Sequence, residues 1–546
     1  MNADEIFNNL SKQMLDKFLQ INPDYATFLG LHEPYDYLMA DGSSERLRQN
    51  LLFMEEWLRT LRKTVKNEEL SDDHKIDWEV LQNAYERSKF DFYERRIQEL
   101  NPDIFEELGG LFFIMFTRNY APIEKRVDAI AARGEKMPQF LEEFRSRFAS
   151  SQPVKLWTEI AIEKAQQIGG LFQFMLFAAK GQVSDKVYER LSNAVMRLEP
   201  ALKIHADWLQ GLLTRTTKQW TLGREKFEKL LKLRTLEMNS EEIYQLGMKY
   251  LKNLKTEREQ LAKQLAPGKT PEEALKTLES ESPKTFEEAL EFTKKTMEDA
   301  RRFIQEKGLA TIYPEDVLLV EETPGFMVPV LPFAAMIMPA RFDKPQIGIY
   351  VVTRPKDAAN LGKHLNFPSI RNTAVHEAFP GHFLQGAISN RGSLVRIFAD
   401  GTETIEGWAH YCEELMAEKG FSGDLETRFV QVNDMIWRAV RIIVDVKLSR
   451  GEMSFDEAVE MLVKEAGMTR EGAIAEVRRY TQTPGYPLSY LLGKHLILKL
   501  KEEVRQKMGD KFSERFFHDT ILADGYLPIS MLRKIFDQKI RKELSS

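Results

Sequence analysis

The stretch Val375-His-Glu-Ala-Phe-Pro-Gly-His382 decides how the chain folds where its two closest histidines lie. His376 and His382 are six positions apart, which would place them on opposite faces of a regular helix. Pro380 and Gly381 lie between them. Proline removes a backbone donor, and glycine accepts unusual dihedral angles. We therefore expect the helix to break or bend at these two residues and to bring the histidines back together.

A histidine–glutamate pair followed by a second histidine is typical of zinc sites in which both histidines bind the metal and the glutamate acts on water. Zinc held by two histidines usually takes a third, anionic ligand and keeps one position open. The second stretch, Glu403-Thr-Ile-Glu-Gly-Trp-Ala-His-Tyr411, offers Glu406, which follows His382 by 24 residues. That length suffices for a loop and a returning antiparallel helix. The spacing predicts one zinc ion held by His376, His382 and Glu406, with Glu377 as the general base.

The returning helix carries further titratable residues. Asp400 is placed to cap it, with Glu403 in its first turn, and Glu406, His410 and Glu413 then share one face. We expect Glu413 or Glu403 to orient a ligand histidine from behind, and His410 to pack or to support the site in the same way. A two-metal site built from Glu403, Glu406 and His410 is an alternative. It would need a further Glu-x-x-His pair, and none is evident.

A third polar stretch lies at residues 478–490 and reads Arg-Arg-Tyr-Thr-Gln-Thr-Pro-Gly-Tyr-Pro-Leu-Ser-Tyr. It lies between two helices with apolar periodicity. A Pro-Gly break surrounded by tyrosine and arginine suits the wall of a cleft. A tyrosine hydroxyl there could donate to the oxyanion that develops when a carbonyl is attacked. On chemistry alone, a helix–helix corner with aromatic packing fits the same pattern slightly better.

Most of the remaining chain has the apolar periodicity of helices. Thr270 with Glu273 and Thr285 with Glu288 form helix-capping signals, and Gly308 ends the helix that follows them. These signals predict a mainly α-helical fold. We divide the chain into an N-terminal helical lobe, residues 1–220, and a catalytic helical lobe, residues 221–546.

Residues 317–352 differ from the rest, because β-branched and aromatic side chains cluster there with several prolines. We expect a small sheet of two or three short strands, such as Ala335–Met338 and Gln346–Val352, just before the active-site helix. Its edge strand could pair with the backbone of an extended peptide. A hairpin that only packs on the helices is the equal alternative.

The overall composition indicates which kinds of binding partner and which cellular compartment to expect. The 546 residues include 77 basic and 83 acidic side chains, a net charge of −6, without a block of one sign. We therefore expect no nucleic-acid or membrane partner. Cys412 is the one cysteine, which excludes an intramolecular disulfide and a thiolate-cluster metal site. Residues 1–18 lack the apolar core of a signal peptide, and no segment has the apolar length of a membrane span, so we expect a cytoplasmic protein.

The two metal-binding stretches resemble the HExxPGH and EGWA signatures of domain-of-unknown-function family number 885, which is grouped by similarity with gluzincin zinc metallopeptidases. The resemblance covers nearly the whole chain. Its other segments are residues 22–30, 223–231, 240–247, 484–490 and 517–525. The chain departs from the family at Tyr486, where glutamine is usual, and at His410, where leucine is usual.

The resemblance implies a two-lobed, helical, metallopeptidase-like fold with a deep cleft, similar to the helical oligopeptidases and carboxypeptidases. It implies the same ligands and general base as the spacing. It also raises Tyr490 to a candidate catalytic donor, and Arg479, Tyr480 and Tyr486 to candidate substrate contacts.

We therefore expect zinc-dependent hydrolysis of peptide bonds, or related amide bonds, in short peptides. Arg438, Arg441 and Arg479 are candidate anchors for a C-terminal carboxylate. The alternative is a non-hydrolytic, helical peptide-binding protein with a structural or vestigial metal site. A structural zinc site usually has four protein ligands, whereas three ligands beside an unpaired glutamate leave room for water. The sequence leaves open whether the chain forms a homodimer.

Overall fold

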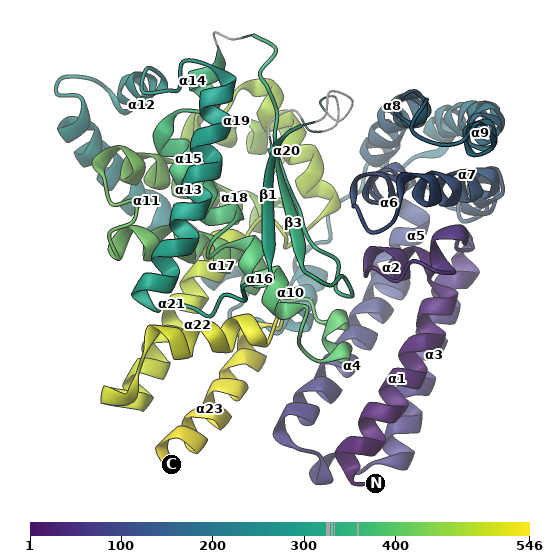
Figure 1. Cartoon of the computed structure of the whole chain (residues 1–546), viewed down its shortest axis with the longest axis horizontal. Coiled ribbons are helices and arrows are strands. Elements are labelled where there is room, and N and C mark those ends of the chain that lie inside the picture. The colour runs from purple at the N-terminus through teal and green to yellow at the C-terminus, as the bar shows by residue number, and fades with distance from the viewer. Residues whose placement is uncertain (324–327, 329–330, 332–333, 358–359, 546) are drawn as a thin grey trace. The chain divides into compact units, whose positions relative to one another are not determined.

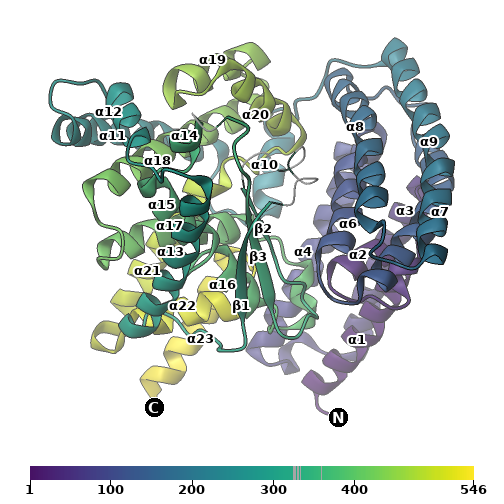
Figure 2. The ribbon, with the colours of Figure 1, turned by 45° about the horizontal axis from the view of Figure 1, so that its top comes forward.

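The computed structural model describes residues 1–323, 328, 331, 334–357 and 360–545. The chain is mainly helical with one small sheet, which confirms the predicted fold class at this level (Figures 1 and 2). Residue contacts divide it into two compact units: Met1–Trp220 with Ala340–Asp343, and Thr221–Pro339 with Lys344–Ser546. Among the described helices, none combines the length and apolar character that crossing a bilayer requires.

The first unit is built of α-helices. They are α1 (Ala3–Ile21), α2 (Pro23–Phe28), α3 (Ser44–Thr64), α4 (Asp72–Phe90), α5 (Ile97–Leu100), α6 (Phe105–Thr117), α7 (Ile123–Ser146), α8 (Lys155–Ala179) and α9 (Asp185–Leu212). Helices α7 and α8 both pack on α9, and α6 packs on α7 and α8. Their shared core is rich in phenylalanine, including the buried Phe112, Phe144 and Phe148.

The second unit contains the remaining helices and the sheet. Its helices are α10 (Arg224–Leu233), α11 (Ser240–Leu265), α12 (Pro271–Glu279), α13 (Phe286–Lys307), α14 (Leu361–His364), α15 (Phe367–Glu377), α16 (His382–Ser389), α17 (Thr402–Glu418), α18 (Leu425–Arg450), α19 (Phe455–Ala466), α20 (Arg470–Gln482), α21 (Ser489–Met508), α22 (Glu514–Ala523) and α23 (Ile529–Ser545). Helix α18 packs on α11, α15, α17 and α21, and most of its side chains are buried.

The predicted capping signals at α12 and α13 are confirmed. The Thr270 side chain accepts a hydrogen bond from the Glu273 N–H, and the Glu273 carboxylate accepts one from the Thr270 N–H. The Thr285 side chain accepts from the Glu288 N–H at the start of α13. Helix α13 ends at Gly308, whose φ of 59° is the left-handed conformation that favours glycine.

The sheet has three strands, β1 (Val317–Glu322), β2 (Ala334–Ile337) and β3 (Ile347–Val352), in the order β1-β3-β2. Strand β3 pairs in parallel with β1 and antiparallel with β2, so β2 is an edge strand. The prediction of a small sheet before α15 is confirmed: β2 is shifted by one residue from the predicted Ala335–Met338, and β3 begins one residue later than the predicted Gln346–Val352 and ends at the same residue. Strand β1 packs on α13 (Figure 2), and Gly348 in β3 lets the sheet approach α16, because a Cβ there would overlap the ring of Phe383.

Helices α17 and α21 cross with their backbones in contact. A Cβ at Gly407 in α17 would overlap the backbone of Gly493 in α21, and a Cβ at Gly493 would overlap the carbonyl oxygen of Glu403. Two glycines at one crossing allow this approach because neither has a side chain. The crossing holds the start of α21 beside the acidic residues of α17.

The predicted cap of α17 is wrong. The helix begins at Thr402, and its N-cap is Gly401 instead of Asp400. The Asp400 carboxylate instead accepts a hydrogen bond from the Thr402 hydroxyl, at 2.7 Å. The reason lies in tertiary packing: the carbonyl oxygens of Tyr526 and Leu527 lie so close to Gly401 that only glycine fits at the cap position.

We expect Gly493→Ala to lower the free energy of unfolding by about 1–3 kcal/mol, because the added methyl group must push two helix backbones apart. The matched control is Gly170→Ala in α8, where an added Cβ would have nothing within 4 Å. That substitution removes a flexible glycine from a helix and should stabilise the chain by roughly 0.5–1 kcal/mol. Urea denaturation followed by circular dichroism measures both. Equal stability of the two variants would contradict the close crossing.

Candidate metal centre

The helix that carries His376 is broken where the sequence predicts a break. Helix α15 ends at Glu377, and α16 begins at His382. Gly381, at the junction, donates its N–H to the carbonyl oxygen of Val375 at 3.1 Å. A Cβ on Gly381 would overlap the carbonyl oxygen of His376, so the chain can double back this tightly only with glycine. As a result, the rings of His376 and His382 lie 4.9 Å apart, nearly perpendicular to each other.

The break is held by a tryptophan to which the sequence analysis assigned no role. Trp408, fully buried in α17, donates its indole N–H to the carbonyl oxygen of Pro380 at 2.8 Å. The position of Trp408 between Glu406 and His410, in the stretch that carries the third candidate ligand, could have indicated that this side chain lies near the site. Helix α17 therefore holds the broken segment and carries the third candidate ligand.

His376, His382 and Glu406 converge on one point. One nitrogen or carboxylate oxygen from each residue lies within 4.8 Å of the other two. The His382 Nε2 atom is 3.6 Å from Glu406 Oε2. Zinc bonds of about 2.0–2.2 Å place neighbouring ligand atoms roughly 3.3 Å apart in a tetrahedron. Two imidazoles and one carboxylate are also the donor set of zinc sites with an open position, so these residues fit a zinc ion.

The predicted contact between Glu413 and a ligand histidine is present. Glu413 Oε1 lies 2.7 Å from His376 Nδ1, and Asn372 donates to Glu413 Oε2 at 3.0 Å. Burial alone would raise the pKa of Glu413, but its close contacts with His410 and with His376 hold the pKa well below its usual range. The ionised carboxylate holds the His376 ring by Nδ1 and leaves Nε2 to face the other two ligands. Asn372 was missed, although it lies one helical turn before His376.

Glu406 is held on both sides. The Tyr486 hydroxyl donates to Glu406 Oε1 at 2.5 Å, while Oε2 faces His382. Burial opposes ionisation, but His382 and the Tyr486 hydrogen bond outweigh it and lower the pKa of Glu406 to about 2. The structure therefore assigns Tyr486 to a ligand carboxylate, where the sequence predicted a substrate contact.

Of the two residues predicted to orient a ligand histidine, Glu413 contacts His376 and Glu403 has a different partner. The Glu403 carboxylate pairs with the guanidinium of Arg234 at 2.6 Å, and both side chains are buried. Burial raises the pKa of Glu403, and the Arg234 charge opposes that effect. A buried carboxylate needs a partner, and Arg234 at the end of α10 supplies it away from the histidines.

His410 lies behind the site, in contact with Glu413. Its Nδ1 atom is 3.3 Å from Glu413 Oε1, and the ring is fully buried. Burial lowers the pKa of His410 to about 3, so the ring is neutral. The described residues contain no second cluster of metal-binding side chains that would form the alternative two-metal site with Glu403 and His410.

The three arginines proposed as substrate anchors all have protein partners. Arg441 is buried and pairs with Glu476 at 2.9 Å, and Arg479 pairs with the same carboxylate oxygen at 2.9 Å. Arg438 donates to the carbonyl oxygen of Asp434 at 3.1 Å. Tyr480 accepts a hydrogen bond from Arg441 at 2.9 Å and is only 2% exposed. Tyr480 is therefore a packing residue, which corrects its predicted role as a substrate contact.

Tyr490 lies at the start of α21, next to the tyrosine that holds Glu406. The rings of Tyr486 and Tyr490 are 6.0 Å apart and nearly perpendicular.

The loop before α21 is fixed by Asp445, which the sequence analysis missed as a supporting residue. Asp445 accepts hydrogen bonds from the N–H groups of Gly485 and Leu488 at 2.9 and 3.1 Å.

Glu377 is the exception among the acids near the site. Among the described residues, none makes a hydrogen bond or ion pair with its half-buried carboxylate. The Glu377 charge acts on His376 and also on Tyr350 in β3, where burial and that charge together raise the pKa of the phenol. Tyr350 was missed, although it lies in the predicted strand just before this helix. An unpaired carboxylate next to His376 is free to accept and release a proton.

The chain is similar to known proteins both in sequence and in fold. The family model described as "Bacterial protein of unknown function (DUF885)" matches residues 23–535. A solved candidate lipoprotein of unknown function from Shewanella oneidensis is 23% identical, with a TM-score of 0.78 over 97% of this chain and 99% of that one. A candidate lipoprotein from Colwellia psychrerythraea is 18% identical, with a TM-score of 0.85 over 99% of this chain and 100% of that one. No match is found among curated proteins.

The two solved structures share the fold of this chain over almost their entire lengths. The family match extends from the second helix to the last one and includes both stretches that carry the candidate metal ligands. This chain therefore belongs to the DUF885 family of bacterial proteins of unknown function.

Proposed function

We propose that this protein is a zinc-dependent peptidase that hydrolyses peptide bonds, or related amide bonds, in short peptides. One observation carries the proposal: His376, His382 and Glu406 converge to within 4.8 Å, and the unpaired carboxylate of Glu377 follows His376 directly. Gluzincin metallopeptidases use this set of residue types, so the proposal extends the resemblance of the two sequence signatures to the reaction.

Zinc bound at this site would supply a Lewis acid that polarises the substrate carbonyl and acidifies water. Glu377 accepts a proton from the attacking water and passes it to the leaving amine. Glu413 holds the His376 ring in one orientation, and Tyr486 does the same for Glu406. Tyr490 is the candidate donor to the carbonyl oxygen as it becomes negatively charged.

The number of protein ligands favours a catalytic metal ion over a structural one. A structural zinc ion is usually enclosed by four protein ligands, and the cluster of described residues supplies three. The carboxylate beside it, Glu377, is without a partner among the described residues, although burying an unpaired acid costs stability. A site that only held its metal would have no use for such a residue.

We expect the purified protein to bind one zinc ion per chain, measured by inductively coupled plasma mass spectrometry after dialysis against chelated buffer. His382→Ala should remove one of three ligands and leave the protein without zinc after the same dialysis. His495→Ala is the matched control, because His495 contacts Tyr250 and lies outside the cluster. Equal zinc in the two variants would contradict the assignment of His382.

Replacing Glu413 tests whether this carboxylate orients His376 for metal binding. Glu413→Gln keeps the size of the side chain but removes the negative charge that faces His376 Nδ1. We expect about a 10- to 100-fold loss of zinc affinity, the range typical for residues that orient a ligand histidine. Competition with a fluorescent zinc chelator measures it. An unchanged affinity would show that His376 needs no support from Glu413.

Glu377→Gln tests the reaction. It should retain zinc and lose peptide cleavage by about 10²- to 10⁴-fold, the usual contribution of a general base. Cleavage is measured by digesting a broad pool of synthetic peptides and identifying the products by mass spectrometry, so that many substrate sequences are tested together. If the zinc-loaded wild-type protein cuts no peptide in the pool, the non-hydrolytic peptide-binding protein is the better account.

A further inference from the structure

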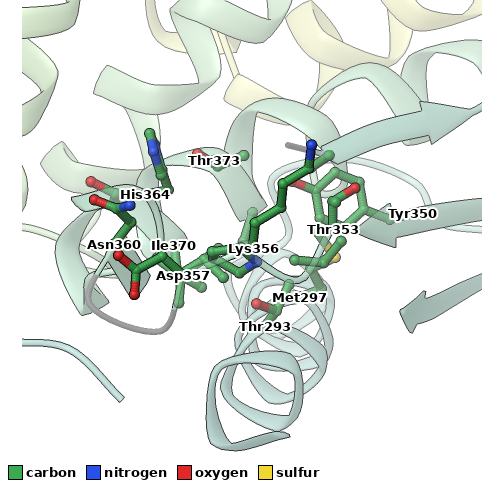
Figure 3. Close-up of a pocket in the computed structure, with 16 residues that line it drawn as sticks. Thr293, Met297, Tyr350, Thr353, Lys356, Asp357, Asn360, His364, Ile370 and Thr373 are labelled. Carbon is green, nitrogen blue, oxygen red and sulfur yellow. The ribbon is translucent and has the colours of Figure 1, made fainter. Parts of the chain in front are cut away.

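A pocket lies in the second unit between α13, β3 and α15 (Figure 3). Its volume is about 380 Å³, at the lower end of the usual range for small-molecule sites. Met297, Val352 and Ile370 contribute apolar surface to its walls. The exposed polar residues that line it are Lys356, Asp357, Asn360 and His364. The pocket therefore suits one residue-sized ligand with an apolar body and a polar end.

The pocket lies on the Glu377 side of α15. Ile370, Thr373 and Ala374 line it, and Glu377 follows them at the spacing i, i+3, i+4 and i+7. Residues at this spacing share one face of a helix, so Glu377 lies about one turn, roughly 5 Å, beyond the wall of the pocket. Tyr350 of β3 lines the pocket as well. The shared face of α15 places the pocket beside the proposed base.

Lys356 is the cation that this pocket offers. Its side chain is exposed, and none of the described residues forms a hydrogen bond or ion pair with its ammonium group. Figure 3 shows the Lys356 side chain extending across the pocket toward Tyr350. By contrast, Arg441 and Arg479 are both paired with Glu476. Lys356 is therefore the best placed cation for a negative group of a ligand in this pocket.

The direction of proton transfer decides which part of a peptide this pocket would hold. In hydrolysis, water adds its oxygen to the carbonyl carbon, the C–N bond breaks, and Glu377 carries a proton from the water to the leaving amine. The amine must therefore come within hydrogen-bond reach of Glu377. The residue that carries this amine then lies next to the pocket on the same face of α15.

We propose that this pocket binds the substrate residue on the leaving-amine side of the cleaved bond, and that a carboxylate of this residue pairs with Lys356. The inference rests on the proposed peptidase function and names its substrate class. The carboxylate has two sources: the C-terminus of the peptide, when the pocket holds the last residue, or an acidic side chain.

Three peptides distinguish the two sources: Ala-Ala-Phe, its C-terminal amide, and Ala-Ala-Glu amide. A terminal carboxylate predicts a kcat/KM for Ala-Ala-Phe about tenfold above that of its amide, the factor expected of one charge-assisted hydrogen bond. A side-chain carboxylate predicts the same advantage for Ala-Ala-Glu amide over Ala-Ala-Phe amide. Equal rates on all three peptides would overturn the role of Lys356.

Lys356→Gln should abolish the preference by raising KM, and Lys356→Arg should keep it. The matched control is Lys363→Gln, an exposed lysine that does not line this pocket. If Lys356→Gln and Lys363→Gln behave alike on the preferred peptide, the inference is wrong.

Binding separates this inference from the proposed function. In the zinc-loaded Glu377→Gln protein, calorimetric titration with the preferred peptide measures recognition without turnover, and adding Lys356→Gln should raise Kd about tenfold. Cleavage and binding that are both independent of Lys356 would overturn the pocket assignment and leave the peptidase intact. Binding that depends on Lys356, with no cleavage of any peptide by the wild-type protein, would support the pocket and overturn the peptidase.

Discussion

The contact between Gly381 and the carbonyl oxygen of His376 is the constraint on which the candidate metal centre depends. Any side chain at position 381 would occupy the space of that oxygen, and the chain could not turn back after α15. The turn is then fixed from outside by the hydrogen bond from Trp408 to Pro380. Because Glu406 lies two residues before Trp408 on α17, the same helix positions the broken segment and the carboxylate that faces His382.

Charge compensation explains why neighbouring acids have different roles. A buried carboxylate needs a counter-charge or hydrogen-bond donors, and each acid that α17 buries near the site finds different ones. Glu403 pairs with Arg234, Glu406 faces His382, and Glu413 faces His376. Glu377 has no such partner among the described residues. This difference is the reason for proposing Glu377, and not an acid of α17, as the group that transfers a proton.

The sequence predicted what depends on local chemistry. Capping at Thr270, the break at Pro380-Gly381 and the small sheet all follow from residue types at short spacing, and the structure contains them. The sequence predicted the contact of Glu413 with a ligand histidine, but it did not predict that Tyr486 and Arg234 are the partners of two other acids in α17. Tyr486 meets Glu406, and Arg234 meets Glu403, only because α17, α21 and the end of α10 pack together, and no spacing rule specifies that packing. For the same reason, Ala340–Asp343 was not expected to belong with the first unit.

The most direct test of the central claim is anomalous diffraction from crystals of the zinc-loaded protein, collected on both sides of the zinc absorption edge. The account predicts one strong peak about 2.0–2.2 Å from a nitrogen of His376, a nitrogen of His382 and a carboxylate oxygen of Glu406. It also predicts that the Glu377 carboxylate is not a ligand. A peak at another group of residues, or one enclosed by four protein ligands at this site, would contradict the account.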